Sequence, residues 1–105
     1  KKAENYYRQA LNIDPTNPTA YSGLSLSLYG ARKDCMNSIK NINIAISLYP
    51  VWREYYEQLY YLYNGCKVDK KKLDELKRKY SGLFKQDIDK SIEINPALRF
   101  GGRVE

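Results

Sequence analysis

Few residues in this chain are of the types that usually perform catalysis or bind metals. None of its 105 residues is histidine, so it has no imidazole base, no histidine-activated nucleophile and no histidine metal ligand. Two carboxylate pairs, Asp74 with Glu75 and Asp87 with Asp89, have no spacing that fixes a catalytic geometry. We therefore expect no catalytic residue, no metal site and no cofactor, and we do not expect an enzyme.

The two cysteines also lack a recognisable chemical arrangement. Cys35 and Cys66 lie 31 residues apart without a CxxC motif, far from the cysteine density of small secreted domains. We expect both to be ordinary reduced thiols. The first residues contain no apolar signal-peptide core, and no apolar run approaches the ~20 residues that a membrane-spanning helix needs. These observations predict a cytoplasmic protein without a membrane span.

A surplus of positive charge suggests an anionic partner. The formal net charge is +6, and residues 67–79 hold +4 of it, from seven basic and three acidic residues. A basic helix of this kind can contact phosphates or acidic lipids. The candidate residues of this basic segment are Lys67, Lys70, Lys71, Lys72, Arg78 and Lys79. Four of them, Lys71, Lys72, Arg78 and Lys79, lie mostly opposite the apolar stripe Leu73/Leu76/Tyr80, as on any solvated helix face. We therefore do not expect nucleic acid as the main partner.

Helices must position these side chains, because apolar residues recur at helical spacing along almost the whole chain. No stretch alternates apolar and polar residues for long, so the fold class that we predict is all-α. A chain of this length forms at most one domain. We expect five helices, at residues 1–13, 18–29, 34–48, 51–64 and 70–94.

Capping residues indicate where these helices begin and end. Asn17, Asp34 and Asp69 are suited to accept the first free amides of the helices that follow them. Gly30 is suited to a left-handed conformation at the end of the second helix. The apolar stripe of the last helix keeps its phase across Gly82. This favours one long helix, in spite of the ~1 kcal/mol that an internal glycine costs.

Small, aromatic and proline residues repeat with a period of 35 residues. One set is Ala3, Tyr7, Ala10 and Pro15, matched by Ser38, Ile42, Ala45 and Pro50 and, at a longer spacing, by Phe84, Ile88, Ser91 and Pro96. A second set is Tyr21, Leu24, Ser25 and Leu28, matched by Tyr56, Leu59, Tyr60 and Tyr63. A fixed period of this length is typical of proteins built from stacked helical hairpins.

With this spacing the chain resembles the tetratricopeptide repeat family, most closely in the segment KKAENYYRQALNIDPTNPTAY. The resemblance implies a right-handed superhelical stack of antiparallel helix hairpins, an α-solenoid. On this basis, residues 1–15 are the second helix of a truncated unit, residues 18–50 a central unit and residues 51–96 a divergent unit. An irregular tail follows at residues 97–105. We expect the chain to be a piece of a longer repeat array.

The divergent unit departs from the family pattern where its two helices should approach most closely. Ser25 and Ser38 occupy these positions in the central unit, whereas Tyr60 and Phe84 occupy them in the divergent unit. Two rings need more room than two hydroxymethyl groups. We therefore expect a divergent helix pair with an elongated second helix, which would cap the array.

The resemblance also implies a function, because the family binds peptides or partner helices in a groove lined by the first helix of each unit. We therefore expect a protein interaction scaffold. The residues that would line its groove are Thr19, Ser22, Leu26, Tyr29, Glu54, Glu57, Tyr61 and Asn64. Glu54 and Glu57 favour a basic or mixed peptide and argue against a clamp for a terminal carboxylate. The same positions could instead be solvated helix sides, and preceding units could hold the groove.

Two alternative functions stay open. The first helix lacks the partner of a complete unit, so the face with Tyr6 and Tyr7 is expected to be exposed. Either a second copy of the chain, in a homodimer, or a missing N-terminal partner would cover that face. The basic segment would instead bind an anionic surface, either nucleic acid or acidic lipid.

Overall fold

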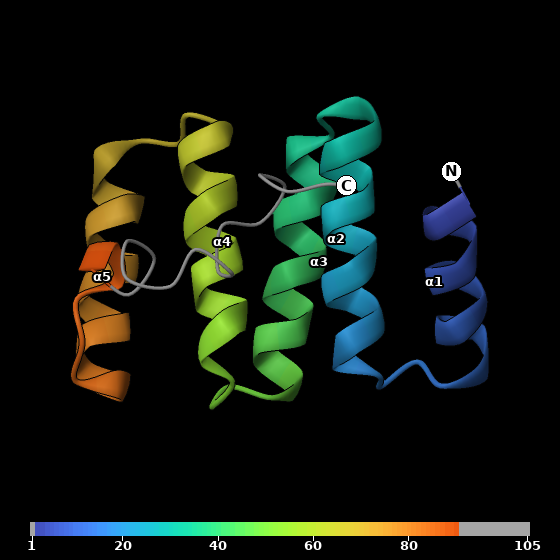
Figure 1. The fold of residues 1–105 in the computed structure, drawn as a ribbon, viewed down its shortest axis with the longest axis horizontal. Helices are drawn as coiled ribbons and strands as arrows, with labels where there is room; N and C mark the ends of the chain where they lie inside the picture. The colour runs from blue at the N-terminus through green and yellow to red at the C-terminus, as the bar shows by residue number, and fades with distance from the viewer. Residues whose placement is uncertain (1, 91–105) are drawn as a thin grey trace. The chain divides into compact units, whose positions relative to one another are not determined.

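Helices form all the regular secondary structure in the part of the protein that the structure describes (Figure 1). This computed structural model describes residues 2–90. Its five helices are α1 (Lys2–Ile13), α2 (Pro18–Arg32), α3 (Cys35–Leu48), α4 (Arg53–Gly65) and α5 (Lys70–Phe84). Residues 88–90 are again helical. The predicted all-α class is confirmed.

Side chains cap the starts of three helices, as the sequence predicts. Asn17, Asp34 and Asp69 each accept a hydrogen bond from the backbone amide three residues later, at 3.1–3.2 Å. Each cap satisfies an amide that has no partner within its helix. α4 begins differently, because its N-cap residue, Trp52, makes no capping hydrogen bond through its side chain.

The second helix ends later than predicted. Gly30 lies within α2, which continues to Arg32, and Lys33 takes the left-handed conformation with φ 53°. The Lys33 N–H bonds to the carbonyl of Tyr29 at 2.9 Å, which satisfies an acceptor at the helix end. A cationic residue near a helix C-terminus is also stabilised by the helix dipole. These interactions offset the strain that a left-handed lysine carries.

The predicted continuous helix over residues 70–94 is wrong. α5 ends at Phe84, and Lys85 is left-handed with φ 57°, its N–H bonded to a carbonyl of the last turn at 2.9 Å. Asp87 then accepts a hydrogen bond from the amide two residues later, at 2.9 Å, as an N-cap does. Gly82 lies inside α5 and does not interrupt it. Lys85, which ends α5, and Asp87, which caps the next helical turn, therefore interrupt the helix. The apolar pattern alone had predicted that the helix would continue.

Some predictions concern residues outside the described range. The third set of repeat positions includes Ser91 and Pro96, and the predicted tail covers residues 97–105. Both lie outside the described residues.

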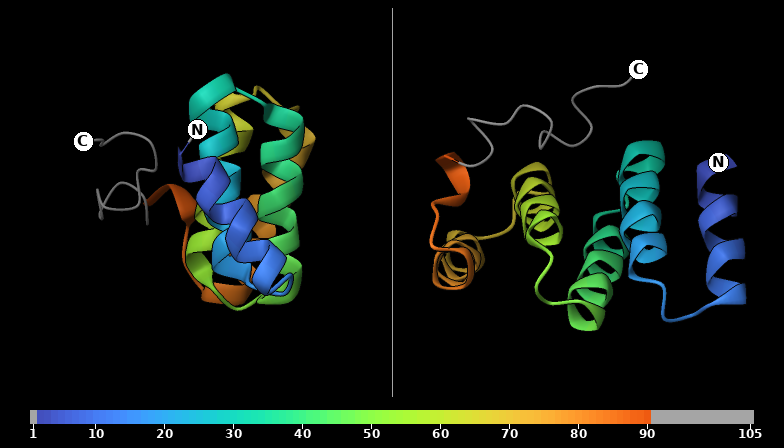
Figure 2. Two further views of the ribbon diagram at one scale, coloured as in Figure 1. Left: turned by 90° about the vertical axis from the view of Figure 1, so that its right-hand side faces the viewer. Right: turned by 60° about the horizontal axis from the view of Figure 1, so that its bottom comes forward.

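The chain divides into two compact units between Pro50 and Val51. In the N-terminal unit, α2 lies between α1 and α3, and the three helices alternate in direction (Figure 2). In the C-terminal unit, α4 and α5 form an antiparallel pair (Figure 1). A right-handed stack of hairpins stays a prediction.

Small residues allow α2 and α3 to pack closely. Ser25 and Ser38 are both 0% exposed, and the Ser25 hydroxyl donates to the Ser38 carbonyl at 2.6 Å. Ile42 and Ala45, which belong to the same repeat set as Ser38, are also 0% exposed. The close approach predicted for the two serines is confirmed.

An aromatic ring joins α1 to α2. The Tyr7 ring lies so close to Gly23 that a β-carbon on this glycine would come within 2.2 Å of it. Other apolar side chains of α1 face solvent, because Tyr6 is 66% exposed and Ile13 is 86% exposed. Of the two tyrosines predicted to form an exposed face, Tyr6 is therefore exposed and Tyr7 packs against α2.

Large side chains join α4 to α5. The Phe84 ring packs against the rings of Tyr56 and Tyr80, with centroid separations of 5.5 and 5.0 Å. Tyr60, at the other position where the family has a small residue, donates its hydroxyl to Asp89. Ring packing and tyrosine hydroxyls therefore take the place of the serine contact that joins α2 to α3.

Candidate functional site

The predicted groove positions on α2 differ in exposure. Thr19 is exposed, Ser22 and Leu26 are half-buried, and Tyr29 is buried. The ammonium of Lys33 lies 4.4 Å from the centroid of the Tyr29 ring, in a cation–π contact. Tyr29 therefore presents little surface to a ligand.

The predicted groove positions on α4 include one core residue. Glu54 and Asn64 are exposed and Tyr61 is half-buried, whereas Glu57 is 0% exposed. Glu57 is turned towards α5, where the Tyr80 hydroxyl donates to its Oε2. The sequence places Glu57 beside the exposed Glu54 on one helix face, but packing against α5 covers it.

The buried carboxyl of Glu57 has an unusual environment. Its Oε2 lies 3.6 Å from Nε of Arg53, one turn earlier in α4, and its Oε1 is buried without a hydrogen-bond partner. Removal from water raises the pKa of Glu57, while the Tyr80 hydroxyl and the Arg53 charge act in the opposite direction. We interpret Glu57 as a residue that holds α4 to α5.

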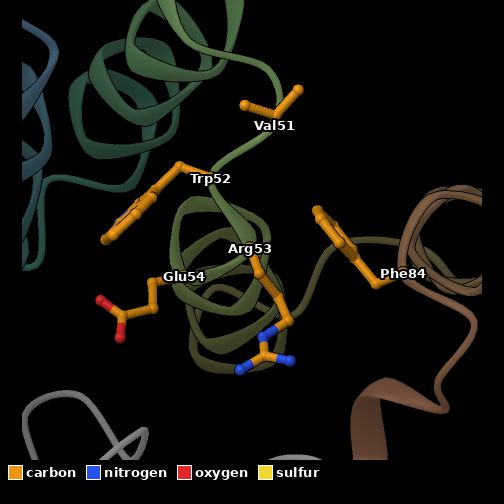
Figure 3. Close-up of a pocket in the computed structure, with 5 residues that line it drawn as sticks. All are labelled: Val51, Trp52, Arg53, Glu54 and Phe84. Carbon is orange, nitrogen blue, oxygen red and sulfur yellow. The ribbon is translucent and has the colours of Figure 1, made fainter.

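A pocket opens at the N-terminus of α4 (Figure 3). It has a volume of about 260 Å³, and its lining residues are Val51, Trp52, Arg53, Glu54 and Phe84. Val51 and Trp52 are adjacent in sequence, and they are 63% and 45% exposed. Neighbouring apolar side chains that face solvent often mark a binding surface.

The sequence between α3 and α4 explains why a pocket forms here. Pro50 follows the end of α3, and the chain turns before α4 begins at Arg53. Figure 3 shows Trp52 and Glu54 on one side of the first turn of α4 and Phe84 on the other, with Arg53 between them. The Phe84 ring packs against the rings of Tyr56 and Tyr80. Two helix ends therefore fix the pocket walls.

The two charged side chains of the pocket differ in their surroundings. Arg53 donates from Nη1 to Oε1 of Gln86 at 3.2 Å, and its Nε faces the carboxyl of Glu57. Glu54 is exposed and has no hydrogen-bond or ion-pair partner among residues 2–90. Of the two, Glu54 is therefore the one left without a partner in residues 2–90.

Sequence reasoning identified only one residue of this pocket as a binding residue, Glu54. It did not identify Val51, Trp52 or Arg53, and it assigned Phe84 to helix packing alone. One signal was present in the sequence: Val51 and Trp52, the only tryptophan of the chain, follow a helix-ending proline. Large apolar residues in a connection between helices are candidates for a binding surface, since connections lie at the surface.

The basic candidates lie in and before α5. All six side chains of the basic segment are exposed. Lys70 forms an ion pair with Asp74 at 3.0 Å, and Lys79 lies 5.8 Å from the centroid of the Tyr56 ring. Exposure and local pairing are typical of a solvated helix face, and anion binding by this segment stays a prediction.

Both cysteines are oxidised. Cys35 and Cys66 are disulfide-bonded, and the described residues contain no free cysteine. The predicted reduced thiols are therefore wrong, because the spacing of cysteines in a sequence does not show which thiols a fold oxidises. The cytoplasmic location stays a prediction.

Within residues 2–90, no group of three or more His, Cys, Asp or Glu side chains is arranged to hold a metal ion. No helix of this described range is both long and apolar enough to cross a membrane. Comparison with family models, curated proteins and solved structures found no match.

Proposed function

We propose that this chain is a protein interaction module of the tetratricopeptide kind, which binds a peptide or a helix of another protein. The pocket at the N-terminus of α4 carries this proposal, because Val51 and Trp52 expose apolar surface beside two charged residues. Trp and Arg are enriched among the residues that contribute most to protein interfaces. Apolar surface at a helix end, flanked by charge, suits a peptide better than a small polar metabolite.

The packing of the N-terminal unit supports the repeat part of the proposal. The Ser25 hydroxyl bonds to the Ser38 carbonyl, and Ile42 and Ala45 are fully buried at the spacing of the repeat. Small residues at matched positions let paired helices approach closely, as in stacked helical hairpins. Hairpins of this kind act as rigid supports for a binding surface.

Rigidity of the pocket supports binding without a large ordering cost. Phe84 packs on two rings, and the Arg53 side chain is held by Gln86 and Glu57. A site whose side chains are already ordered loses less conformational entropy when a ligand binds. The pocket therefore needs little rearrangement to accept a partner.

Affinity capture from an extract of the native source tests the proposal. The intact chain is compared with a variant that combines Trp52→Ser and Glu54→Lys. We expect at least one protein to be retained by the intact chain and lost with this variant, because the variant removes both the exposed ring and the negative charge of Glu54.

A matched variant controls for loss of exposed apolar surface elsewhere. Met36 on α3 is 77% exposed, so Met36→Ser removes a similar exposed side chain outside the pocket. This control should retain the same proteins as the intact chain. Equal retention by all three chains would contradict the proposed function.

A further inference from the structure

We infer that the pocket at the N-terminus of α4 binds a peptide motif in which an aromatic side chain lies next to an arginine. This inference rests on the proposed function and deepens it by naming the chemistry of the partner. The aromatic side chain enters the pocket, and the arginine pairs with Glu54 at its rim.

The apolar part of the pocket selects the aromatic side chain. Trp52 and Phe84 lie on opposite sides of the first turn of α4, with Val51 above them in Figure 3. A volume of about 260 Å³ suits one large side chain and is too small for a folded segment. An aromatic guest gains edge-to-face contacts with host rings in addition to the burial of apolar area. The pocket is therefore matched to a single aromatic residue.

The carboxylate of Glu54 favours an arginine in the bound peptide. Glu54 is exposed and has no partner within the described residues, whereas the guanidinium of Arg53 bonds to Gln86 and faces Glu57. An acidic neighbour in the guest would compete with Glu57 for Arg53 and would be repelled by Glu54. An arginine neighbour instead forms a bidentate pair with the Glu54 carboxylate. Charge complementarity therefore favours a basic residue beside the aromatic one.

The single tryptophan gives a direct readout. Because the chain has one tryptophan, the indole N–H of Trp52 gives one separate signal in an amide correlation spectrum of the ¹⁵N-labelled protein. The probes are four capped dipeptides: acetyl-Phe-Arg-amide, acetyl-Phe-citrulline-amide, acetyl-Phe-Glu-amide and acetyl-Ala-Arg-amide. Citrulline keeps the shape of arginine without its charge.

We expect acetyl-Phe-Arg-amide to shift the indole signal in a saturable way and to bind most tightly. Loss of the arginine charge in the citrulline peptide should weaken binding about threefold to tenfold. Loss of the phenyl ring should weaken it about tenfold or more. Equal binding of the arginine, citrulline and glutamate peptides would overturn the inference, as would binding that does not need the ring.

A charge swap tests the role of Glu54 itself. Glu54→Lys should weaken the Phe-Arg peptide and strengthen the Phe-Glu peptide, each about threefold to tenfold. The control is Glu75→Lys, which makes the same change at an exposed glutamate of α5 outside the pocket. The control should leave both affinities unchanged. An unchanged peptide preference in Glu54→Lys would overturn the inference.

Failure of this inference can be told apart from failure of the proposed function. If no dipeptide binds, or if the charge swap has no effect, the stated motif is wrong. The capture experiment with Trp52→Ser and Glu54→Lys then decides separately whether the pocket binds a protein. If the dipeptides bind as expected but no captured protein depends on the pocket, the motif chemistry is right and the proposed function is wrong.

Discussion

The ring of Tyr7 occupies the space that any side chain on Gly23 would need, since a β-carbon there would lie 2.2 Å from the ring. A contact this short cannot be accommodated without displacement of the ring. Tyr7 also packs edge-to-face against Tyr6, with ring centroids 5.3 Å apart. The glycine therefore sets how α1 lies on α2.

Replacing Gly23 with alanine should destabilise the protein by about 1–3 kcal/mol, because the added methyl group overpacks the contact between α1 and α2. Gly82→Ala is the matched control, because no atom lies within 4 Å of a β-carbon built on that helical glycine. The control should instead raise the free energy of unfolding by about 0.5–1 kcal/mol. Urea unfolding followed by circular dichroism measures both. Equal effects at the two glycines would contradict the Tyr7 contact.

The buried carboxyl of Glu57 should make stability depend on pH in an unusual direction. Burial raises its pKa above the ordinary 4.5, so the native state holds the proton more tightly than the unfolded chain. The stability contributed by the protonated form is therefore lost as the pH rises from about 4.5 through the higher native pKa.

Glu57→Gln removes this titration and keeps an acceptor for the Tyr80 hydroxyl. The free energy of unfolding of the variant, relative to that of the parent, should increase as the pH rises from about 4.5. Urea unfolding of both proteins at a series of pH values gives this difference. A difference that falls with pH would show that Glu57 is stabilised as a carboxylate.

Glu4 should make the stability of the protein depend on pH in the direction opposite to that of Glu57. Hydrogen bonds from Arg32 at 2.9 Å and Arg8 at 3.0 Å lower its pKa to about 2. A depressed native pKa means that the carboxylate stabilises the protein above about pH 4.5 and that this contribution is lost as the pH falls towards 2.

Glu4→Gln should therefore destabilise the protein at neutral pH, and the difference from the parent should shrink as the pH falls from about 4.5. Urea unfolding of both proteins at the same series of pH values measures this difference in stability. A carbon-detected NMR titration of the Glu4 carboxyl gives the pKa directly, and an ordinary value near 4.5 would contradict the role of Arg32.

The oxidised state of the two cysteines should appear in the protein from its native source. Alkylation in denaturant without a reductant should leave both Cys35 and Cys66 unmodified. Alkylation after treatment with dithiothreitol should modify both, and mass spectrometry counts the added groups. Two alkylated thiols before reduction would restore the prediction from sequence.

Local signals in the sequence predicted much of the fold. Asn17, Asp34 and Asp69 cap helices because a short polar side chain reaches the amide three residues ahead, whatever surrounds it. Ser25 and Ser38 could be predicted to approach each other because a repeated pattern relates positions that are distant in sequence.

Features that depend on tertiary contacts could not be predicted in this way. The exposed face predicted for Glu57 is covered because α5 supplies the Tyr80 hydroxyl. The break after Phe84 depends on the balance between a left-handed Lys85 and the cap at Asp87, which the apolar pattern does not report. The pocket combines residues from two helix ends, and no local signal joins them.

Site-specific photo-cross-linking tests the central claim, that the surface around the α4 pocket binds another protein. Benzoylphenylalanine is placed at Val51 or Glu54 in the pocket and, as controls, at the exposed Met36 of α3 and Ile13 of α1. After irradiation in an extract of the native source, we expect the two pocket positions to cross-link the same protein and the two controls not to do so. Cross-linking of that protein with equal yield from all four positions, or from none, would contradict the account.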